Sequence, residues 1–301
     1  MSVKNCVCST GVIAGLFPGQ GSQTSDLREH VERVVPELLE RCIELVGEDP
    51  FPRVRESTSF AQPAIFCSSI AGWTERAAYV RPVALAGHSL GEFSALVAAG
   101  ALDQESGLEL AVRRGELMAL AETGEAEGML VVLGACEEKL ALLVDEHEVV
   151  VANDNAPGQV VLAGPLRRLR AASKQARELG VRAIPLDVAG AFHSPAMSGA
   201  VEPFRAALDS VEFRPPAIPV ISGSTARPFA QTRAELAAAI VTPVRWRETM
   251  LALAELGADT FVDFGPGEVL ARLVPRNLPD AVLIDLDALP SSSDLESSGV
   301  A

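Results

Sequence analysis

The chain has 301 residues, of which 48% are hydrophobic and 22% are charged, as in ordinary folded globular proteins. Its net charge of −15 disfavours nucleic acid as a partner, and no apolar run reaches the roughly 20 residues of a membrane-spanning helix. The N-terminal residues lack the pattern of a secretion signal, and the five scattered cysteines favour reduced thiols over disulfides. We therefore expect a cytoplasmic protein without a metal site, because Cys6 and Cys8 have no second close-spaced pair.

The first part of the chain alternates strand-like apolar runs with helical periodicity, which predicts an α/β domain with a mainly parallel sheet. Pro36 divides one long helical pattern into two, and Pro63 marks the expected start of the next helix. The last helix of this part is expected to face inward with Leu120, among other leucines. The expected elements are a strand within 11–21, two helices within 25–47, a helix over 62–79, a strand over 82–87, and helices over 90–100 and 104–121.

The middle of the chain has a different order of elements, β-α-β-β-α-β, which is the ferredoxin-like pattern. These elements are a strand over 128–134, a helix over 136–147, strands over 148–154 and 158–164, a helix over 165–179 and a strand over 181–187. The pattern predicts a small subdomain over 124–188, inserted into a catalytic domain made of 1–123 and 189–290.

The α/β pattern resumes after the insertion, and 291–301 has no periodicity, so we expect a mobile tail there. The elements expected before the tail are a helix over 197–209, a strand over 218–222, helices over 231–239 and 244–256, a strand over 260–265 and a helix over 268–274.

The sequence GHSLG at 87–91 places Ser89 between an apolar strand and a helix. Glycines on both sides allow the sharp turn of a nucleophile elbow, and the following helix offers free N–H groups and a positive dipole end where an oxyanion would form. The alternative is that Ser89 only caps this helix. The strand-turn-helix context favours a nucleophile.

A serine nucleophile needs a base, and the chain has four histidines. His30 and His147 lie in patterns typical of surface helices, and the side chain of His88 should point away from that of its neighbour Ser89. His193 lies in a glycine-containing loop just after the predicted subdomain, so by elimination it is the candidate base. No acid stands out as a third member, which disfavours an ordinary esterase.

Two further features bear on the site. The glycine-rich turn FPGQGSQ at 17–23 lacks the Lys-Ser/Thr of a phosphate-binding loop, and it could instead supply a backbone N–H to an oxyanion hole together with Leu90. Arg114 lies in the middle of a mainly buried helix and needs a partner, because an unpaired buried charge is costly. That partner is either a carboxylate of the protein, the commoner case, or a carboxylate of the substrate.

Together these residues resemble the malonyl-CoA:acyl carrier protein transacylases, a family that includes the acyltransferase domains of polyketide synthases. The resemblance covers about 12–275 and rests on seven motifs in order, namely FPGQGSQ, GHSLGEFSAL, RRGELM, NDNAPGQVVLAG, GAFHSPAM, PVRW and DFGPGEVL. It implies an α/β-hydrolase-like large domain with an inserted ferredoxin-like subdomain.

The resemblance also implies roles for residues of this chain. Ser89 would be the nucleophile and His193 the base, with the backbone N–H groups of Gln20 and Leu90 as the oxyanion hole. The pocket residues would be Arg114, which grips the free carboxylate of a malonyl group, together with Gln62 and Phe192. Phe192 would crowd a 2-methyl branch and thus favour malonyl over methylmalonyl.

One position departs from the family pattern. Many bacterial members carry glutamine or asparagine four residues before the proline of PVRW, and its carbonyl orients the histidine. This chain has Ala239 there, which offers only a backbone carbonyl. Either the main chain, a water or another residue must then fix the tautomer of His193.

The function implied by the resemblance is transfer of malonyl from malonyl-CoA through an acyl-serine to the phosphopantetheine thiol of an acyl carrier protein. We expect a monomer with no cofactor of its own, acting in polyketide or fatty-acid biosynthesis. The alternatives are a hydrolase that clears acyl groups from carrier proteins and an inactive scaffold. A gripping Arg114 disfavours the hydrolase, since removing stalled acyl groups does not require a carboxylate to be held.

The segment 165–182 has six basic residues and one acidic residue, a local net charge of +5 in an acidic chain. This is either a solvated helix face or a docking surface for an acidic partner. We predict that the carrier protein docks there, beside the cleft between the domains. The residues predicted for docking are Arg167, Arg168, Arg170 and Lys174.

Overall fold

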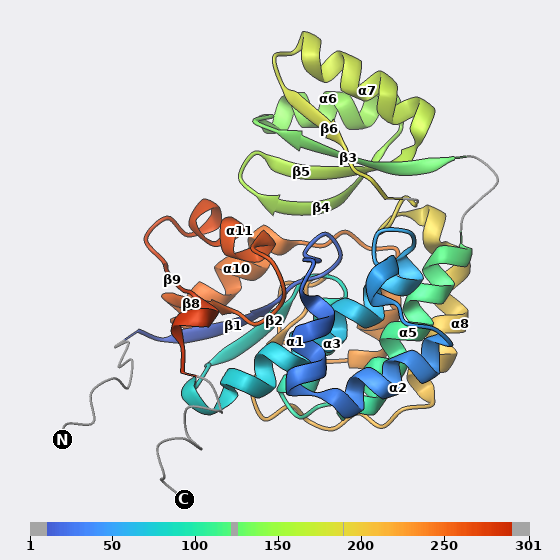
Figure 1. Cartoon of the computed structure of the whole chain (residues 1–301). Coiled ribbons are helices and arrows are strands. Elements are labelled where there is room, and N and C mark those ends of the chain that lie inside the picture. The colour runs from blue at the N-terminus through green and yellow to red at the C-terminus, as the bar shows by residue number, and fades with distance from the viewer. Residues whose placement is uncertain (1–10, 122–125, 189, 291–301) are drawn as a thin grey trace, which may run out of the picture.

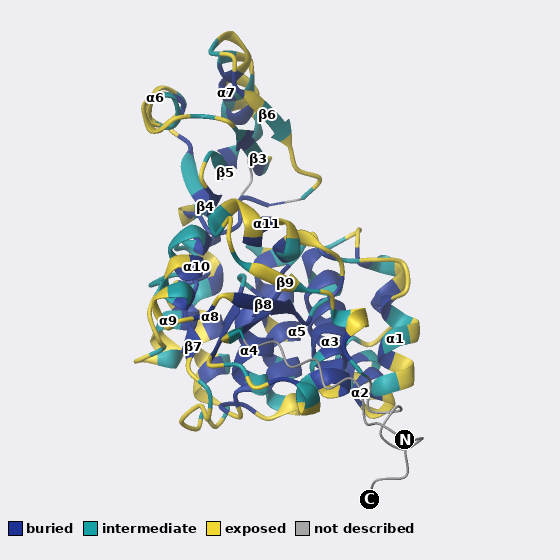
Figure 2. Cartoon of the chain, turned by 90° about the vertical axis from the view of Figure 1, so that its left-hand side faces the viewer, coloured by how far each residue is buried: buried dark blue, intermediate teal, exposed yellow. Residues whose placement is uncertain are grey.

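The computed structural model describes residues 11–121, 126–188 and 190–290 of the chain. Within these ranges the large domain is built on a five-stranded sheet in which all paired strands are parallel, in the order β7-β2-β1-β8-β9. Figure 1 shows a smaller subdomain above this large domain, and Figure 2 shows helices around the sheet, whose strands are buried except for β9 at its edge. The strands are β1 (Ile13–Phe17), β2 (Ala84–Gly87), β7 (Val220–Ile221), β8 (Thr260–Asp263) and β9 (Val282–Ile284).

Short apolar strands and long helices give this domain its core. The central helix α3 is buried on almost every side, and it packs closely against α5. The helices are α1 (Leu27–Val34), α2 (Pro36–Val46), α3 (Thr58–Arg76), α4 (Gly91–Ala98), α5 (Gln104–Leu120), α8 (Ser198–Asp209), α9 (Thr232–Ala238), α10 (Trp246–Glu255) and α11 (Val269–Asn277). No helix of the described residues is both long and apolar enough to span a membrane.

The subdomain is a four-stranded antiparallel sheet, in the order β4-β5-β3-β6, with two helices on one face. Its elements lie inside the predicted 124–188 segment. Their order is β3 (Glu127–Leu133), α6 (Glu137–His147), β4 (Val150–Ala156), β5 (Gln159–Pro165), α7 (Leu166–Glu178) and β6 (Arg182–Pro185). This order and pairing are those of the ferredoxin-like pattern, so the predicted fold class is confirmed.

The two faces of this sheet serve different purposes, because successive strand residues point to opposite sides. Leu130 and Leu162 pack against Leu169 of α7 in a small separate core. Met129 and Val161 point the other way and line a cavity toward the large domain. The sheet therefore forms a wall, with the helices outside and the cavity inside.

Backbone hydrogen bonds join the subdomain to the large domain at the PVRW segment. The N–H of Val244 donates to the Ala152 carbonyl, and the N–H of Asp154 donates to the Val244 carbonyl, both at 2.9 Å. Arg247 adds an ion pair to Asp154 at 3.2 Å. Strand β4 is thereby extended by one bridge into the large domain, which fixes the wall of the cavity.

Several details of the expected elements are wrong. Helix α3 begins at Thr58, capped by Ser57, so Pro63 lies inside the helix rather than at its start. Leu120 is 77% exposed instead of facing inward, because it is the last residue of α5. Strand β9 follows the last expected helix and was not anticipated, since it is only three residues long. The predicted tail 291–301 lies outside the described residues.

Candidate active site

Ser89 occupies a strained turn between β2 and α4. Its φ of 54° is in the left-handed region, which is costly for a residue with a side chain and typical of nucleophile elbows. Glycine is required on both sides: a Cβ on Gly87 would lie 2.0 Å from the Gly91 carbonyl carbon, and one on Gly91 would lie 2.0 Å from the Phe17 oxygen. The strained backbone of this turn therefore directs the serine side chain out of the sheet.

His193 receives the proton of Ser89 in this geometry. The Ser89 Oγ lies 2.7 Å from His193 Nε2, and His193 Nδ1 lies 2.8 Å from the Ala239 carbonyl oxygen. A carbonyl can only accept, so Nδ1 carries the proton and Nε2 is left free to accept from the serine. Of the options left open by Ala239, the structure shows the main chain orienting the ring.

The ring of His193 is neutral at neutral pH, as a general base must be. Burial lowers the pKa of His193 to about 3, and the nearby positive charge of Arg114 acts in the same direction. His193 is 4% exposed, so water does not stabilise its charged form. The structure thus brings together the two residues that the sequence predicted as nucleophile and base.

Arg114 reaches the same serine from α5. Its Nη1 donates to Gln62 Oε1 at 2.8 Å and its Nη2 donates to Ser89 Oγ at 3.0 Å. The side chain is 3% exposed, and no carboxylate of the described residues forms a direct ion pair with it, although the charge of the buried Glu92 acts on it from a greater distance. Burial lowers the pKa of Arg114 to about 10, so it stays a cation at neutral pH. A buried cation without an ionic partner, facing the nucleophile, is suited to hold a substrate carboxylate.

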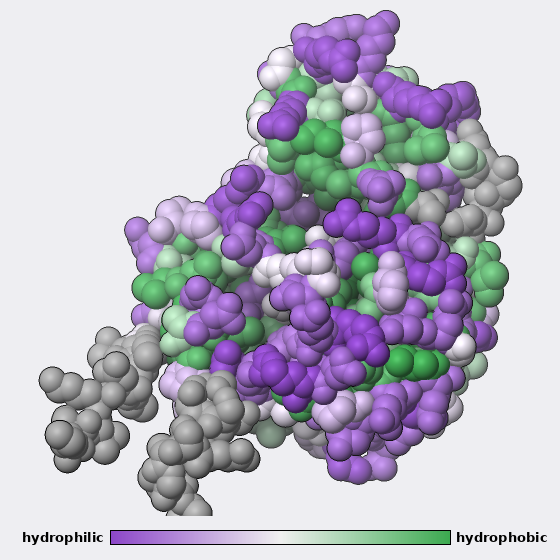
Figure 3. All heavy atoms as spheres, in the orientation of Figure 1, coloured by the Kyte–Doolittle hydropathy of each residue, from purple (hydrophilic) through white to green (hydrophobic). Residues whose placement is uncertain are grey.

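These side chains share one cavity of about 400 Å³ between the domains. Figure 3 shows the groove between the two lobes on this side of the molecule. Gln20 and Leu90 line the cavity, and the side chain of Gln20 is held by a 2.8 Å hydrogen bond from Thr58 Oγ1. Phe192 also lines it and is 8% exposed. The oxyanion role of the two backbone N–H groups stays a prediction.

Met118 and Asn155 are among the site residues that were not singled out in the sequence. Met118 lies one helical turn after Arg114, and its sulfur is 3.5 Å from Gln62 Nε2. Asn155 lies 2.9 Å from His88 Nε2 and so ties the residue before Ser89 to strand β4. The His88 side chain thus binds Asn155, although it lines the same cavity as Ser89. Asn155 belongs to the NDNAPGQ motif, but only the folded chain shows what this motif contacts.

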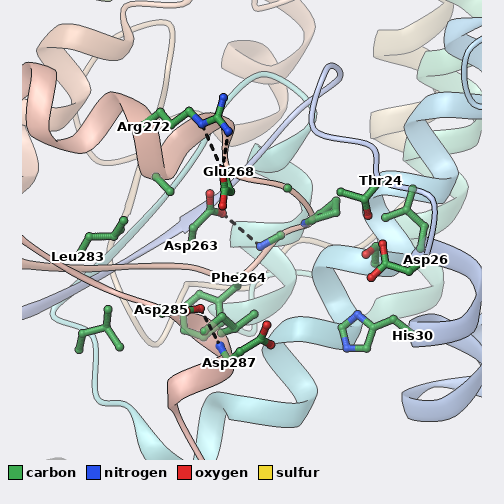
Figure 4. Close-up of a pocket in the computed structure, with 18 of the residues that line it drawn as sticks. Thr24, Asp26, His30, Asp263, Phe264, Glu268, Arg272, Leu283, Asp285 and Asp287 are labelled. Atoms are coloured by element: carbon green, nitrogen blue, oxygen red, sulfur yellow. Dashed lines mark hydrogen bonds and ion pairs between the residues drawn. The ribbon is translucent and has the colours of Figure 1, made fainter.

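A second cavity, of about 700 Å³, lies on the other side of α11. Figure 4 shows its acidic lining, with Asp26, Asp263 and Asp285 among the labelled side chains. None of the predicted site residues lines it, although His30 does. Carboxylates around a cavity would repel a substrate that carries a carboxylate, so we place the active site in the smaller cavity.

The predicted docking helix lies away from the active-site cavity. The expected position beside the cleft is wrong, because α7 covers the outer face of the four-stranded sheet while the cavity is on the inner face. Figure 1 shows α7 at the end of the subdomain that is farthest from the large domain. Arg168 is held there by Glu148 at 2.9 Å, whereas Arg170 and Lys174 are exposed. A role of this helix in carrier-protein binding stays a prediction.

The comparisons with known proteins show which family the chain belongs to. The model of the family described as "Acyl transferase domain" matches residues 40–288. The chain is 37% identical over 287 residues to the polyketide biosynthesis malonyl CoA-acyl carrier protein transacylase PksC of Bacillus subtilis, covering 90% of this chain and 98% of that protein.

Two solved structures show the same fold. The malonyl CoA-acyl carrier protein transacylase of Burkholderia pseudomallei has a TM-score of 0.82 at 36% identity and covers 90% of this chain and 99% of that one. A malonyl-transacylase in complex with its type II polyketide acyl-carrier protein has a TM-score of 0.83 at 29% identity, covering 90% and 94%. Through its motifs, its fold and this catalytic geometry, the chain belongs to the malonyl-CoA:acyl carrier protein transacylase family of acyltransferases.

Proposed function

We propose that this chain transfers malonyl from malonyl-CoA to an acyl carrier protein in two steps through an ester of Ser89. The observation that carries the proposal is the position of Arg114, whose guanidinium donates to the nucleophile at 3.0 Å. An acyl group attached to Ser89 extends into the space beside this cation. A malonyl group would place its free carboxylate there, whereas an acetyl group would leave the guanidinium without an ionic partner.

In the first step, Ser89 Oγ attacks the thioester carbon while His193 Nε2 takes its proton. The oxyanion forms near the Gln20 and Leu90 backbone N–H groups, the C–S bond breaks, and the CoA sulfur leaves with the proton from His193. In the second step, the phosphopantetheine thiol gives its proton to His193 and attacks the ester. The Ser89 oxygen then leaves and recovers that proton, so the enzyme is restored.

Other aspects of the proposal rest on single observations. We propose that the enzyme acts as a monomer, since one chain supplies every group named in the mechanism. A cytoplasmic location is supported by Cys42, Cys67 and Cys136, which are free thiols.

For the basic helix α7 we propose electrostatic steering of the acidic carrier rather than direct contact at the cavity mouth, because the helix lies on the outer face of the sheet.

The test is intact-mass measurement after mixing the enzyme with malonyl-CoA. We expect one malonyl group on wild-type enzyme, none on Ser89→Ala, and loss of the adduct to the thiol of an added carrier protein. Release of free malonate at an equal rate without a carrier would instead identify a hydrolase. Failure to form any adduct would contradict the proposed function.

A further inference from the structure

Glu92 is a buried carboxyl group that the mechanism does not use. It lies one turn after Ser89 on α4 and is 3% exposed. Placing a carboxyl group in the interior is costly unless hydrogen bonds satisfy it. Burial raises the pKa of Glu92 to about 7, despite opposing effects from the Gly223 N–H and from the charge of Arg114. Burying this carboxyl group close to the nucleophile therefore lowers the stability of the folded chain.

The hydrogen bonds of Glu92 connect the serine turn with a distant loop. Its own N–H donates to the Ser89 carbonyl at 3.1 Å, and its Oε1 accepts from the Gly223 N–H at 2.7 Å. The Gly223 carbonyl in turn accepts from the Arg245 N–H at 2.7 Å. A carboxylate that accepts from a buried backbone N–H makes a strong, short contact, so Gly223 is held firmly.

Arg245 ends the segment that orients the base. This segment begins at Ala239, whose carbonyl holds the ring of His193, and it continues through Val244, which pairs with β4. The contacts therefore form a closed ring: from Ser89 through Glu92, Gly223 and the segment 239–245 to His193, and back to Ser89 at 2.7 Å. In this ring of contacts, Glu92 lies next to the nucleophile and the segment 239–245 lies next to the base.

We propose that Glu92 is a positioning residue of the transacylase. By fixing Gly223, its carboxylate keeps the Ala239 carbonyl, and hence the His193 ring, in register with Ser89. The charged groups that act on Glu92 from neighbouring elements are Arg114 on α5 and Glu235 on α9. This role requires an acceptor atom that reaches the Gly223 N–H. The hydrogen bond itself, rather than the negative charge, holds Gly223 in place.

Two substitutions of Glu92 distinguish the effect of side-chain length from the effect of side-chain charge. Glu92→Gln keeps an acceptor at the same distance without the charge, whereas Glu92→Asp keeps the charge but is one methylene shorter. We expect Glu92→Gln to acylate Ser89 with malonyl-CoA within threefold of wild type. Glu92→Asp should acylate at least tenfold more slowly, with the Kd for malonyl-CoA changed less than threefold.

A matched control is Asp263→Asn. Asp263 is also buried, also accepts from a glycine N–H, at 3.2 Å from Gly265, and lies outside the ring, in the wall of the second cavity shown in Figure 4. We expect wild-type acylation in this variant. The downfield imidazole N–H proton signal of His193, assigned with His193→Ala, supplies an independent readout. It should persist in Glu92→Gln and shift or broaden in Glu92→Asp.

Any of three results would overturn the proposal. The first is wild-type acylation by Glu92→Asp, and the second is a loss in Glu92→Gln as large as in Glu92→Asp. The third is slow acylation of Glu92→Asp with the His193 signal unchanged. Thermal unfolding of each variant shows whether it is folded at the assay temperature. If Glu92→Asp is not folded, slow acylation or a changed His193 signal in folded Glu92→Gln still overturns the proposal.

Discussion

Replacing Arg114 by alanine removes the cation that faces the nucleophile. In the malonyl-enzyme, we expect two guanidinium N–H groups to hold the carboxylate, since Nη1 and Nη2 both point toward the site, at Gln62 and Ser89. A hydrogen bond to a charged group contributes about 1.5–3 kcal/mol, so two give about 3–6 kcal/mol. At 1.4 kcal/mol per factor of ten, malonyl acylation should fall by at least roughly 100-fold.

An acetyl group has no carboxylate for Arg114 to hold, and acetyl acylation should change far less. The assay is single-turnover acylation by malonyl-CoA and acetyl-CoA, followed by intact mass. The matched control is Arg113→Ala: the neighbouring Arg113 side chain is 47% exposed and pairs with Glu116 at 3.1 Å, so both rates should stay near wild type. Equal losses of malonyl and acetyl acylation in Arg114→Ala would refute the proposed role of the guanidinium.

Three further predictions concern charged and titratable groups, two of them at the site and one on α7. Because the pKa of His193 is about 3, its neutral base form is present down to about that pH. The acylation rate in pH-jump experiments should therefore stay level from about pH 8 to 5. A rate that falls to half its maximum near pH 6.5 would contradict this. Glu92 has a raised pKa of about 7, so the folded state binds more protons than the unfolded state between about pH 4.5 and 7, and wild type loses stability as pH rises through this window. Glu92→Gln should therefore gain about 2–3 kcal/mol relative to wild type between pH 4.5 and 8 in urea unfolding; a constant difference would show that the carboxyl group is not buried as described. Finally, Arg167→Glu with Arg170→Glu should raise the KM for carrier protein at low salt, with less effect at high salt and none on malonyl-CoA acylation; an unchanged KM at low salt would rule out steering by α7.

The sequence alone determined the order of elements, the inserted ferredoxin-like pattern and the turn around Ser89. These follow from local rules: apolar periodicity, glycine and proline positions, and the spacing of motifs. Local rules were weaker at element ends. Pro63 suggested a helix start, but Ser57 caps α3 earlier and Pro63 lies inside it. Leu120 fits the helical period yet lies at an exposed helix end.

Tertiary structure alone decided how distant residues act together. The partner of Arg114 could not be chosen from the sequence, since a protein carboxylate was the commoner possibility; only packing of α5 beside α3 shows the guanidinium between Gln62 and Ser89. The orientation of His193 rests on a backbone carbonyl, which every residue possesses, so the side chain at Ala239 could not reveal it. The outer position of α7 depends on which face of the sheet its side chains cover, because strand residues alternate and helices on the two faces share the same amphipathic pattern.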